Sequence, residues 1–575
     1  MSLRRNRRAA ETFRPQTPVG AGQTTTRRRI VEEQIMARRR WLMFGWAIVW
    51  GIPCAIQAGE PLVDIRDFGA KPDGKTLCTE AIQAAIDRCA AAGGGTVLLP
   101  AGRWLSGTIF LKSHVTLRLA AGCVLWGSTD PKDYPEIIPS VRSYTDRYVR
   151  QSLIAGEDLD DVALCGRGII DGNGQAFRWK QWKDRPYLIR LVNCRDVRVE
   201  GITLRNSAMW MQHYLACDRV RIHGITVWNH VSYNNDGLDI DGCHDVTVSD
   251  CVMDTDDDAL CLKSTLNRAC ENVTISNCIL SSHCNALKMG TESNGGFRNI
   301  TITNCAIVSP RHTTSTYGRR RGLAGIALEL VDGGTLDQVL VSNVAIRGVT
   351  VPIFLRLGNR ARPFKKDMPK PSVGRFRNVV LSSVVATGTG DIGCSITGIP
   401  GHPIENVTLR DINLEFEGGG TAEHADREVP EREAAYPESG MFGVLPAYGF
   451  YCRHAKGLRF ENVRLQTKTP DQRHALVCDD VSDLVIDGLD TPGSTEARPV
   501  IRLTDTRDVL IRGCRPSEPV NTFLQLTGAR TERVVLTAND LRRVHRTVQR
   551  GPKVAADVLT DLANVTKGKH AGDEL

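Results

Sequence analysis

The chain has 575 residues, a formal net charge of +8, 6% aromatic residues and 53 glycines. That length allows several domains or one long repeat, and this composition favours short strands joined by turns over a helical bundle. Residues 1–58 contain eleven arginines and three glutamates but no lysine or aspartate, which accounts for the whole net charge. The remainder is close to neutral, so we expect no nucleic-acid partner.

Residues 1–58 are predicted to be a basic leader that ends in a signal peptide. Residues 37–40 form a basic cluster, residues 41–56 are apolar, and Ala58 supplies a small residue for cleavage. The apolar run contains Pro53 and is shorter than the ~20 residues of a membrane span. We therefore expect export to the periplasm or the extracellular space, with no stable membrane span after cleavage. A membrane anchor is the alternative.

The next segment predicts a cap on a stacked sheet. Residues 63–69 have the pattern of a strand and turn, and residues 79–92 carry apolar side chains at helical spacing. Three glycines at 93–95 end this helix before a strand at 96–99. A short helix here would cover unpaired strand edges at the open end of the sheet.

A short phrase then recurs: a polar residue, an alternating strand, a Gly, Asn or Asp, and a second apolar strand. Its first copies begin 23, 26, 27 and 27 residues apart, at Asp196, Arg219, Asp245, Asn272 and Asn299. Later copies begin at Gln338, Asn378, Asn406, Asp483, Asp508 and Arg533. Each copy is too short to bury its own apolar face, and stacking the copies buries a continuous core.

This repeat predicts an all-β fold, a single-stranded right-handed parallel β-helix with a short N-terminal capping helix. The two-residue alternation indicates strands, and the handedness follows the crossover rule for parallel strands. A β-propeller is the alternative, but its blades need ~40–50 residues. We expect a leader at 1–58, the β-helix domain at 59–550 and a C-terminal tail at 551–575, helical or disordered from about Lys553.

Residues 417–448 interrupt the repeat with Gly, Glu and Pro, which predicts a loop insertion. Its aromatic and sulfur-containing side chains either close one end of a groove or pack on the flank of the solenoid. These side chains are Tyr436, Met441, Phe442 and Tyr448.

Seven cysteines recur at the repeat spacing, in two sets: Cys194, Cys217, Cys243 and Cys270, and Cys251, Cys278 and Cys305. We interpret each set as a column of small buried thiols rather than a disulfide framework. Neighbouring coils also lie near the Cα separation of a disulfide, ~4.4–6.8 Å, so bridges are the alternative.

Polar residues also recur at nearly this spacing. Asp236 and Asp257 are 21 residues apart, and Asp258 and His283 are 25 apart. His213 precedes Asp236 by 23, and Lys263 precedes Lys288 by 25. Because adjacent coils lie about 4.8 Å apart, we expect these side chains to stack in one column.

Three carboxylates in one patch cannot all stay ionised without cost, so at least one pKa should rise. One protonated and one ionised carboxyl group is the arrangement that cleaves glycosidic bonds. A carboxyl separation of ~6.5–9.5 Å leaves room for water and leads to inversion, whereas ~5–5.5 Å leads to retention. Two coil spacings, or one spacing plus a diagonal, could supply the wider separation. The alternatives are backbone-bonding turn residues and a calcium site.

The motifs resemble those of glycoside hydrolase family 28, the polygalacturonases. Asn234-Asn235-Asp236-Gly237 is similar to the family's Asn-Thr-Asp-Gly, Asp257-Asp258 to its Asp-Asp, and Ser282-His283-Cys284 to its Gly-His-Gly. Asp67-Phe68-Gly69-Ala70 and Gly93-Gly94-Gly95-Thr96 recur in pectin-active β-helices. The resemblance covers roughly residues 63–545.

The resemblance implies a right-handed β-helix, inversion, a pectic polysaccharide substrate and no metal or cofactor. Asp257 would be the general acid, Asp236 and Asp258 would hold and deprotonate the water, and His283 would tune the acid. Substrate binding is assigned to Asn234, which would orient the sugar, and to His213, Lys263 and Lys288. A monomer is expected.

Two departures concern the substrate. The family's Arg-Ile-Lys motif, which grips the galacturonate carboxylate, falls at Ala327-Leu328-Glu329, where Glu329 would repel that group. Lys263, Lys288 or the run 319–321 would have to replace the cations. Cys284 also leaves less room beside His283 than glycine. A branched pectin such as rhamnogalacturonan is therefore an alternative to polygalacturonan.

Two other functions fit the same scaffold. A polysaccharide lyase would use Lys263 or Lys288 as the base, usually with calcium. A non-catalytic glycan-binding solenoid would bind glycan without producing reducing ends. Exo-action is favoured if the 417–448 loop closes one end of the groove.

Overall fold

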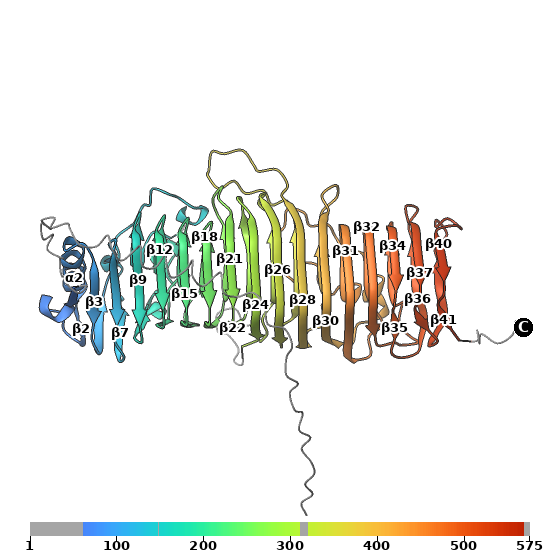
Figure 1. The fold of residues 1–575 in the computed structure, drawn as a ribbon, viewed down its shortest axis with the longest axis horizontal. Coiled ribbons are helices and arrows are strands. Elements are labelled where there is room, and N and C mark those ends of the chain that lie inside the picture. The colour runs from blue at the N-terminus through green and yellow to red at the C-terminus, as the bar shows by residue number, and fades with distance from the viewer. Residues whose placement is uncertain (1–60, 148, 311–319, 568–575) are drawn as a thin grey trace, which may run out of the picture. The chain divides into compact units, whose positions relative to one another are not determined.

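The computed structural model describes residues 61–147, 149–310 and 320–567. The chain divides into two units, Met1–Gly59 and Glu60–Leu575. The predicted leader and signal peptide lie outside the described residues. The second unit is a stack of coils in which each coil contributes strands to three parallel ladders (Figure 1).

The first ladder contains the alternating strands of the repeat. In order along the stack it comprises β1 (Leu62–Asp64), β3 (Gly95–Leu99), β6 (Val115–Leu119), β9 (Asp160–Gly166), β12 (Arg195–Glu200), β15 (Asp218–His223), β18 (His244–Ser249), β21 (Cys270–Ser276), β24 (Phe297–Val308), β26 (Thr335–Arg347), β28 (Arg375–Thr389), β30 (Ile404–Gly418), β31 (Ala447–Thr469), β32 (His474–Thr491), β34 (Arg507–Arg512), β37 (Glu532–Thr537) and β40 (Leu559–Leu562).

The second ladder follows the first within each coil. It comprises β2 (Asp73–Leu77), β4 (Gly102–Ser106), β7 (Cys123–Gly127), β10 (Ile169–Asp171), β13 (Thr203–Arg205), β16 (Thr226–Asn229), β19 (Val252–Thr255), β22 (Ile279–Ser282), the later parts of β24, β26, β28, β30, β31 and β32, and β35 (Arg515–Pro516). The short strands β38 (Asp540–Leu541) and β41 (Val565–Thr566) pair with each other.

The third ladder carries the polar residues of interest. It comprises β5 (Ile109–Phe110), β8 (Ser152–Glu157), β11 (Tyr187–Val192), β14 (Gln212–Leu215), β17 (Leu238–Asp241), β20 (Leu260–Ser264), β23 (Asn285–Ser293), β25 (Ala324–Leu330), β27 (Val351–Leu357), β29 (Cys394–Thr397), the opening parts of β31 and β32, β33 (Ile501–Thr504), β36 (Val520–Thr527) and β39 (Val544–Arg550).

Helices are few and short. The α-helices are α2 (Thr79–Ala91) and α3 (Ala422–Ala425), and the 3-10 turns are η1 (Ile65–Phe68), η2 (Pro131–Asp133), η3 (Tyr144–Arg147), η4 (Gly174–Phe177) and η5 (Trp182–Asp184). Helix α2 buries Ile82, Ala85, Ile86 and Cys89 against the first coils and covers that end of the stack (Figure 1). The predicted capping helix is therefore confirmed.

The polar residue that opens each repeat has a defined backbone role. All eleven of these residues have φ between +51° and +58°, the left-handed region in which Asn and Asp are enriched. Their amides also bond between coils: Asn272 Nδ2 donates to Asp245 Oδ1 at 2.9 Å, and Asn299 Nδ2 donates to Asn272 Oδ1 at 2.7 Å. The repeat in the sequence therefore marks a turn that recurs once per coil.

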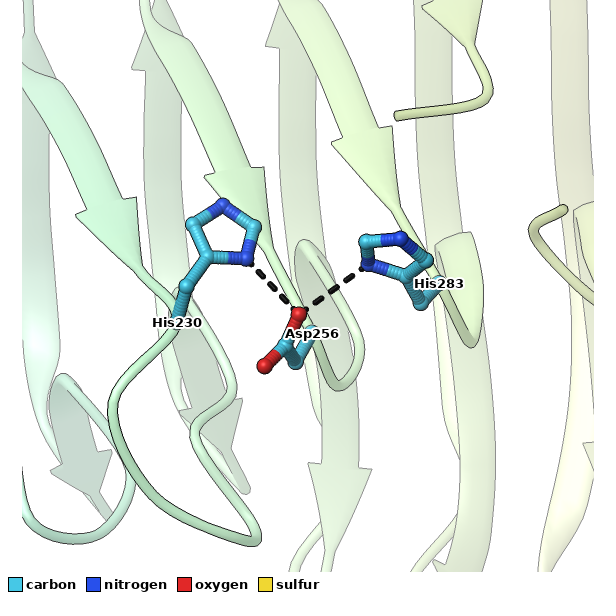
Figure 2. A group of neighbouring side chains, drawn as sticks. All are labelled: His230, Asp256 and His283. Carbon is cyan, nitrogen blue, oxygen red and sulfur yellow. Dashed lines mark hydrogen bonds and ion pairs between the residues drawn. The ribbon is translucent and has the colours of Figure 1, made fainter. Parts of the chain in front are cut away.

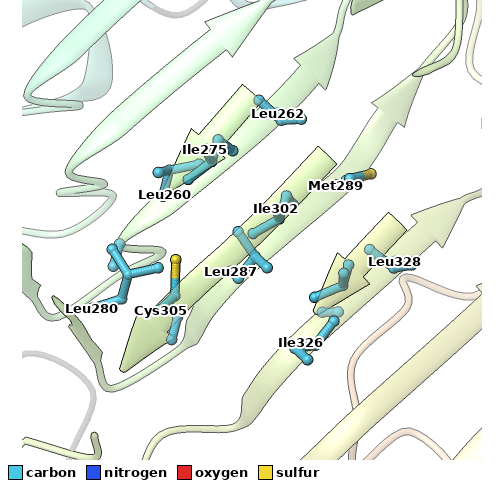
Figure 3. Packing of buried hydrophobic residues seen from close by; sticks show 14 of the residues in the cluster. Leu260, Leu262, Ile275, Leu280, Leu287, Met289, Ile302, Cys305, Ile326 and Leu328 are labelled. Carbon is cyan, nitrogen blue, oxygen red and sulfur yellow. The ribbon is translucent and has the colours of Figure 1, made fainter. Parts of the chain in front are cut away.

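The core runs through the middle of the stack. Equivalent side chains lie above one another in successive coils, as Leu260, Leu287 and Ile326 do (Figure 3). Both cysteine columns line this core, and all seventeen cysteines of the described residues are free thiols. The prediction of stacked thiols is therefore confirmed for the seven cysteines of the two columns. The continuous parallel ladders exclude a β-propeller.

The loop insertion and the tail have different outcomes. A long connection containing α3 joins β30 to β31, as the composition of 417–448 predicts. The expectation of a helix from about Lys553 is wrong within the described residues, because β40 there pairs with β37 and extends the first ladder. Stacking on the preceding coil gives this polar segment partners that its own composition does not reveal.

The third ladder differs from the first in burial. Strands of the first ladder alternate between buried and exposed residues, whereas every residue of β11, β14, β17, β20 and β25 is buried. Lys263, Lys288 and Glu292 of this ladder line a cavity together with residues from the connections. Among the described residues, no helix is long and apolar enough to cross a membrane.

Candidate active site

The predicted carboxylates lie in successive turns between the second and third ladders. Asp236 lies between β16 and β17, Asp257 and Asp258 lie between β19 and β20, and His283 lies between β22 and β23. Because these strands are neighbours in their ladders, the turns stack. One carboxylate oxygen from each of the three aspartates lies within 4.8 Å of the other two.

These aspartates line a cavity of about 230 Å³. Its walls come from connections far apart in the sequence, including η3, η5 and the long loops after β27 and β30. The lining residues are Tyr144, Thr145, Trp182, Met209, Trp210, Asn234, Asp236, Asp257, Asp258, Lys263, Lys288, Glu292, Arg362 and Tyr436. Six of the eight predicted site residues are therefore brought together, and His213 and His283 lie outside the lining.

Asp236 is buried beside another carboxyl group, Asp239. Lys263 Nζ lies 3.4 Å from Asp236 Oδ2 and 3.3 Å from Asp239 Oδ1. Burial nevertheless raises the pKa of Asp236 well above its usual value, and the charges of Asp239 and Asp257 add to this effect. Burial likewise raises the pKa of Asp239 to about 8. The sequence-based expectation that one carboxyl pKa rises is met at Asp236.

Gly237, next to Asp236, is required by the packing of the turns. A Cβ at this position would lie 2.5 Å from the carbonyl oxygen of Ala259 in the next coil. The Gly237 backbone N–H also donates to the Asp258 carbonyl at 2.9 Å. The motif glycine therefore allows the two carboxylate-bearing turns to approach closely.

Asp258 has the opposite electrostatics to Asp236. Its burial favours the neutral form, but Lys288 and Lys263 outweigh burial and hold the pKa of Asp258 below its usual value. Lys288 Nζ is 3.0 Å from Asp258 Oδ2, and Asn285 Nδ2 donates to Asp258 Oδ1 at 2.9 Å. The cluster therefore contains one carboxyl group that favours its proton and one that favours ionisation.

Asp257 is the least buried of the three. Its backbone N–H donates to Asn235 Oδ1 at 3.1 Å, and its own Oδ1 accepts the backbone N–H of Asp258 at 3.0 Å. Asn235 is fully buried and is fixed by Asn229, whose carbonyl accepts the Asn235 Nδ2 at 2.7 Å. This network orients the Asp257 turn toward the cavity.

A bulge brings further charges to the cavity. The register between β20 and β23 shifts after Leu262, so that Gly290, Thr291 and Glu292 are accommodated before Ser293. Gly290 has φ +102°, and a Cβ there would lie 2.2 Å from the Glu329 carbonyl oxygen. Bulges of this kind re-aim side chains beside active sites, and this one supplies Glu292.

Arg362 enters the cavity from the loop after β27. Its Nη2 lies 2.6 Å from Glu292 Oε1 and 2.9 Å from Asp332 Oδ2, and its guanidinium lies 4.3 Å from the Tyr144 ring centroid. Burial opposes ionisation of Glu292, but Lys263 and Arg362 outweigh it and hold the pKa of Glu292 below its usual value. Arg362 is thus a fixed cation on the cavity wall.

His283 belongs to a group of side chains with His230 and Asp256 (Figure 2). Asp256 Oδ1 lies 2.8 Å from His230 Nδ1 and 3.1 Å from His283 Nδ1. His230 Nε2 lies 3.3 Å from Asp254 Oδ1. Burial lowers the pKa of His230, but its bonds to Asp254 and Asp256 outweigh this and raise it to about 9. The group supports the turn that carries Asp257 and Asp258.

The placement predicted for His213 is wrong in its register. His213 pairs with Asp239 rather than lying over Asp236, because the turn before β17, residues 230–237, is longer than the turn before β14, residues 206–211. His213 is fully buried and its Nε2 bonds Asp241 Oδ2 at 3.0 Å. Lys263 and Lys288 are likewise not register partners: Lys263 pairs with Asp241, and Lys288 with Cys261.

Glu329 does not present a charge to the cavity. It is fully buried below Lys288, whose Nζ lies 3.8 Å away, and burial raises the pKa of Glu329 well above its usual value. Burial thus favours the neutral form of Glu329, and its side chain lies outside the cavity lining, which weakens the repulsion expected from the sequence. Arg321 does not substitute for the missing cations either, since it pairs with Glu417 at 2.6 Å. Arg319 lies outside the described residues.

Several lining residues carried no sequence signal. Tyr144, Trp182 and Arg362 come from connections without repeat periodicity, and only the tertiary structure brings them to the turns. Tyr436 is the one aromatic residue of the predicted loop insertion that lines the cavity. Met441, Phe442 and Tyr448 pack instead in hydrophobic clusters. The packing of part of the loop on the solenoid is therefore confirmed, and closure of one end of the groove stays a prediction.

The comparisons with known proteins agree with this geometry. The profile of the family described as Glycosyl hydrolases family 28 matches residues 89–434, more than half of the chain. The protein belongs to glycosyl hydrolase family 28. The matched region contains every predicted site residue.

Curated relatives and a solved structure give further likenesses. The chain is 37% identical over 226 residues to a "Probable polygalacturonase" of Vitis vinifera, covering 36% of this chain and 46% of that protein. It is 27% identical over 255 residues to an "Exo-poly-alpha-D-galacturonosidase" of Dickeya chrysanthemi, covering 35% and 41%. The chain thus matches less than half the length of these relatives.

A hyperthermoactive exopolygalacturonase from Thermotoga maritima has a similar fold, with a TM-score of 0.55 and 21% identity. That likeness covers 71% of this chain and 92% of the other.

Proposed function

We propose that this chain is an inverting glycoside hydrolase that cleaves glycosidic bonds in a galacturonate-containing pectic polysaccharide, working from a chain end. The observation that carries the proposal is the cluster of Asp236, Asp257 and Asp258, whose closest oxygens lie within 4.8 Å. Burial favours a proton on Asp236, while Lys288 favours ionisation of Asp258. Glycoside hydrolysis requires such a division between acid and base.

In the proposed mechanism Asp257 donates a proton to the glycosidic oxygen as the bond to the anomeric carbon breaks. A water held by Asp236 and Asp258 attacks that carbon from the opposite face, and Asp258 accepts the proton of the water. Asp257 is suited to the acid role because it is the most accessible of the three. Burial favours a proton on the neighbouring Asp236, and carboxyl groups this close to one another share protons.

Inversion rests on the family relationship and not on carboxylate spacing. The closest oxygens, within 4.8 Å, do not support the wide gap that coil counting predicted from the ~6.5–9.5 Å typical of inverting enzymes. Proton NMR of the first product formed decides the point. A product with the substrate's anomeric configuration would exclude inversion.

The cations of the cavity fit a substrate that carries carboxylates. Lys263, Lys288 and Arg362 line it, and Nη1 of Arg362, which the bonds to Asp332 and Glu292 do not use, can donate a charged hydrogen bond to a substrate carboxylate. With burial favouring the neutral form of Glu329, these three cations replace the grip that the Ala327-Leu328-Glu329 segment lacks. Polygalacturonan is therefore the substrate we favour over rhamnogalacturonan. Comparison of both polymers in a reducing-end assay tests this choice.

The same lysines make the lyase alternative unfavourable. A lysine must be neutral to remove a proton, and the carboxylates and other groups around Lys263 and Lys288 outweigh burial and raise both pKa values well above the usual value. Both ammonium groups also lie against the carboxylates, where a calcium ion would otherwise bind. An absorbing unsaturated product that a chelator abolishes would overturn this inference.

Exo-action is supported by the walls of the cavity. Tyr436 from the loop insertion and Tyr144 from η3 both line it, and such walls restrict the pocket to a chain end. We expect monomer or dimer among the earliest products. A ladder of mid-length oligomers at early times would contradict exo-action.

Asp257→Asn tests the reaction itself. Loss of the general acid is expected to lower kcat about 10²- to 10⁴-fold, with an unchanged melting temperature. Asp245→Asn is the matched control, because Asp245 is a turn residue of the first ladder whose partner is Asn272. Wild-type-like turnover by Asp257→Asn would refute its role.

Export, chain organisation and oligomeric state belong to the same proposal. The basic and apolar leader at 1–58 supports export to the periplasm or beyond, followed by a catalytic domain at about 59–550 that acts as a monomer. N-terminal sequencing of the exported protein tests cleavage near Ala58. Light scattering tests the monomer.

A further inference from the structure

The segment Arg178-Trp179-Lys180-Gln181-Trp182-Lys183-Asp184-Arg185, the 178–185 arm, is basic and aromatic. It connects η4 to β11 and contains η5. Trp179 is 78% exposed and Trp182 is 45% exposed. Large apolar side chains gathered at such exposure indicate a binding surface more often than a structural role.

The arm is fixed to the catalytic turn. Arg185 is buried, and its guanidinium donates to the Tyr233 carbonyl at 2.8 Å and to Asn234 Oδ1 at 2.9 Å. Tyr233 and Asn234 belong to the same turn as Asp236, residues 230–237. The arm is therefore held at the rim of the cavity by the same connection that positions a catalytic carboxylate.

The aromatic rings of the arm lie both inside and outside the cavity lining. Trp182 lines the cavity, whereas Trp179 does not. The Trp179 ring centroid lies 6.1 Å from that of Tyr233, and the Arg178 guanidinium lies 4.9 Å from the Trp179 ring centroid. The two rings meet edge to face at 61°, so the exposed Trp179 ring, held beside a cation, is the surface on which the apolar face of a sugar ring can stack.

The arm also carries uncompensated charge. Lys180 and Lys183 are exposed, and neither side chain forms an ion pair within the described part of the chain. Exposed cations without acidic partners attract polyanions and raise their rate of association. Aromatic platforms and free ammonium groups thus occur together beside the cavity.

We propose that the 178–185 arm is a distal binding subsite for the next units of an acidic glycan chain whose end occupies the cavity. Trp182 and Trp179 stack on successive sugar rings, and Lys180 and Lys183 pair with their carboxylates. Trp182 belongs both to the arm and to the cavity lining. A substrate whose end lies in the cavity would therefore continue along the arm, so the occupant of the arm is the unreacted remainder of that chain. This inference rests on the proposed hydrolase function and adds a chain-length preference to it.

Chain-length dependence tests the arm in the full protein. Trp179→Ala is expected to raise KM for long polygalacturonate about fivefold, the scale of one aromatic stacking contact, and to leave kcat unchanged. Hydrolysis of the disaccharide is expected to be unaffected, because Trp179 lies outside the cavity lining. Trp126→Ala is the matched control, because Trp126 also lies beneath an arginine, with Arg103 at 4.6 Å, but outside the cavity lining. An equal loss on disaccharide and polymer would overturn the subsite.

Charge is tested separately. Lys180→Ala/Lys183→Ala is expected to raise KM for the polymer and to weaken its dependence on salt. Lys71→Ala/Lys75→Ala removes the same charge from exposed lysines beside α2 and is the control. Salt dependence that is identical in both double variants would contradict the role of the arm.

Binding without turnover separates this inference from the proposed function. Tryptophan fluorescence of Asp257→Asn, titrated with polygalacturonate, is expected to change, and Trp179→Ala in that background is expected to weaken binding about fivefold. If no pectic glycan is hydrolysed by the wild type, the proposed function fails, while retention of this arm-dependent binding still supports the subsite. Binding that Trp179→Ala leaves unchanged overturns it. Single-stranded DNA that binds the arm more tightly than polygalacturonate also overturns it, in favour of a nucleic-acid surface.

Discussion

Replacement of Lys288 by methionine removes the cation that holds Asp258 ionised. The Nζ to Oδ2 distance is 3.0 Å, and both side chains are at most 4% exposed. At an effective dielectric constant of about 20, that distance corresponds to an attraction of about 5 kcal/mol. Lys263 remains close to Asp258, and water can hydrate the carboxylate once the lysine is gone. The change in the free energy of ionising Asp258 is therefore smaller than this attraction. Without Lys288, burial favours the protonated form of Asp258, and the proposed base loses its proton-accepting form.

The pH–rate profile is the assay for Lys288→Met. We expect kcat/KM at about pH 5 to fall at least ~100-fold, on the scale of general-base catalysis, and the acid limb to move to higher pH. Lys75→Met, at an exposed lysine beside α2, controls for the substitution. A folded Lys288→Met variant with an unmoved acid limb and near-normal kcat/KM would refute the assignment of Asp258 as a base maintained by Lys288.

Stability gives an independent readout of the same pair. A depressed carboxyl pKa contributes stability above the unfolded pKa of about 3.9, and this contribution is lost as the pH falls through the folded pKa. Lys288→Met leaves a buried carboxyl group uncompensated, at a cost of about 3 kcal/mol near neutral pH. The difference in unfolding free energy should shrink as the pH approaches 4. A difference that does not vary with pH would show that the loss is one of packing alone.

Three further predictions follow from other parts of the structure. His230→Gln should cost about 3 kcal/mol of stability below pH 6.5. The pKa of His230 is raised to about 9, and the stability this contributes is lost as the pH rises through that value. If urea unfolding gives the same cost at pH 10, the ion pair with Asp256 is contradicted. Arg362→Gln should raise KM for polygalacturonate about tenfold, on the scale of a charged hydrogen bond. Arg377→Gln is the control and should leave KM unchanged, because Arg377 pairs with Asp337 on the first ladder. Equal KM values for the two variants would exclude Arg362 from substrate binding. Dithiothreitol should leave the melting temperature unchanged because the described cysteines are free thiols, and a fall of several degrees would indicate disulfides.

The coil repeat and the capping helix were predictable because their signals are local. The polar residue that opens each repeat adopts a left-handed turn that Asn and Asp favour, and the alternating residues after it face the core in turn. The carboxylate motif was predictable for the same reason: Asp236, Asp257 and Asp258 lie in equivalent turns of adjacent coils. Local preferences repeated at a fixed period therefore specify both the stack and the turns that meet within it.

Register was less predictable, because turn length varies between coils. Counting residues placed His213 over Asp236, but the longer turn before β17 shifts that pairing to Asp239. The tail from about Lys553 illustrates a related limit. Its strand β40 forms on the edge that β37 provides, and such stabilisation by a neighbouring strand leaves little trace in local composition.

The parallel β-helix, its cap and the three carboxylates of the proposed site could be predicted, since each depends on residues close in the chain or one coil apart. The surroundings of those carboxylates could not, because they depend on how distant segments pack. Arg362, Tyr436 and Trp182 reach the cavity from irregular connections, whose paths depend on packing rather than period. Burial likewise decided the charge of Glu329, because a side-chain pKa depends on solvent exclusion and on neighbouring charges that only the folded chain brings together.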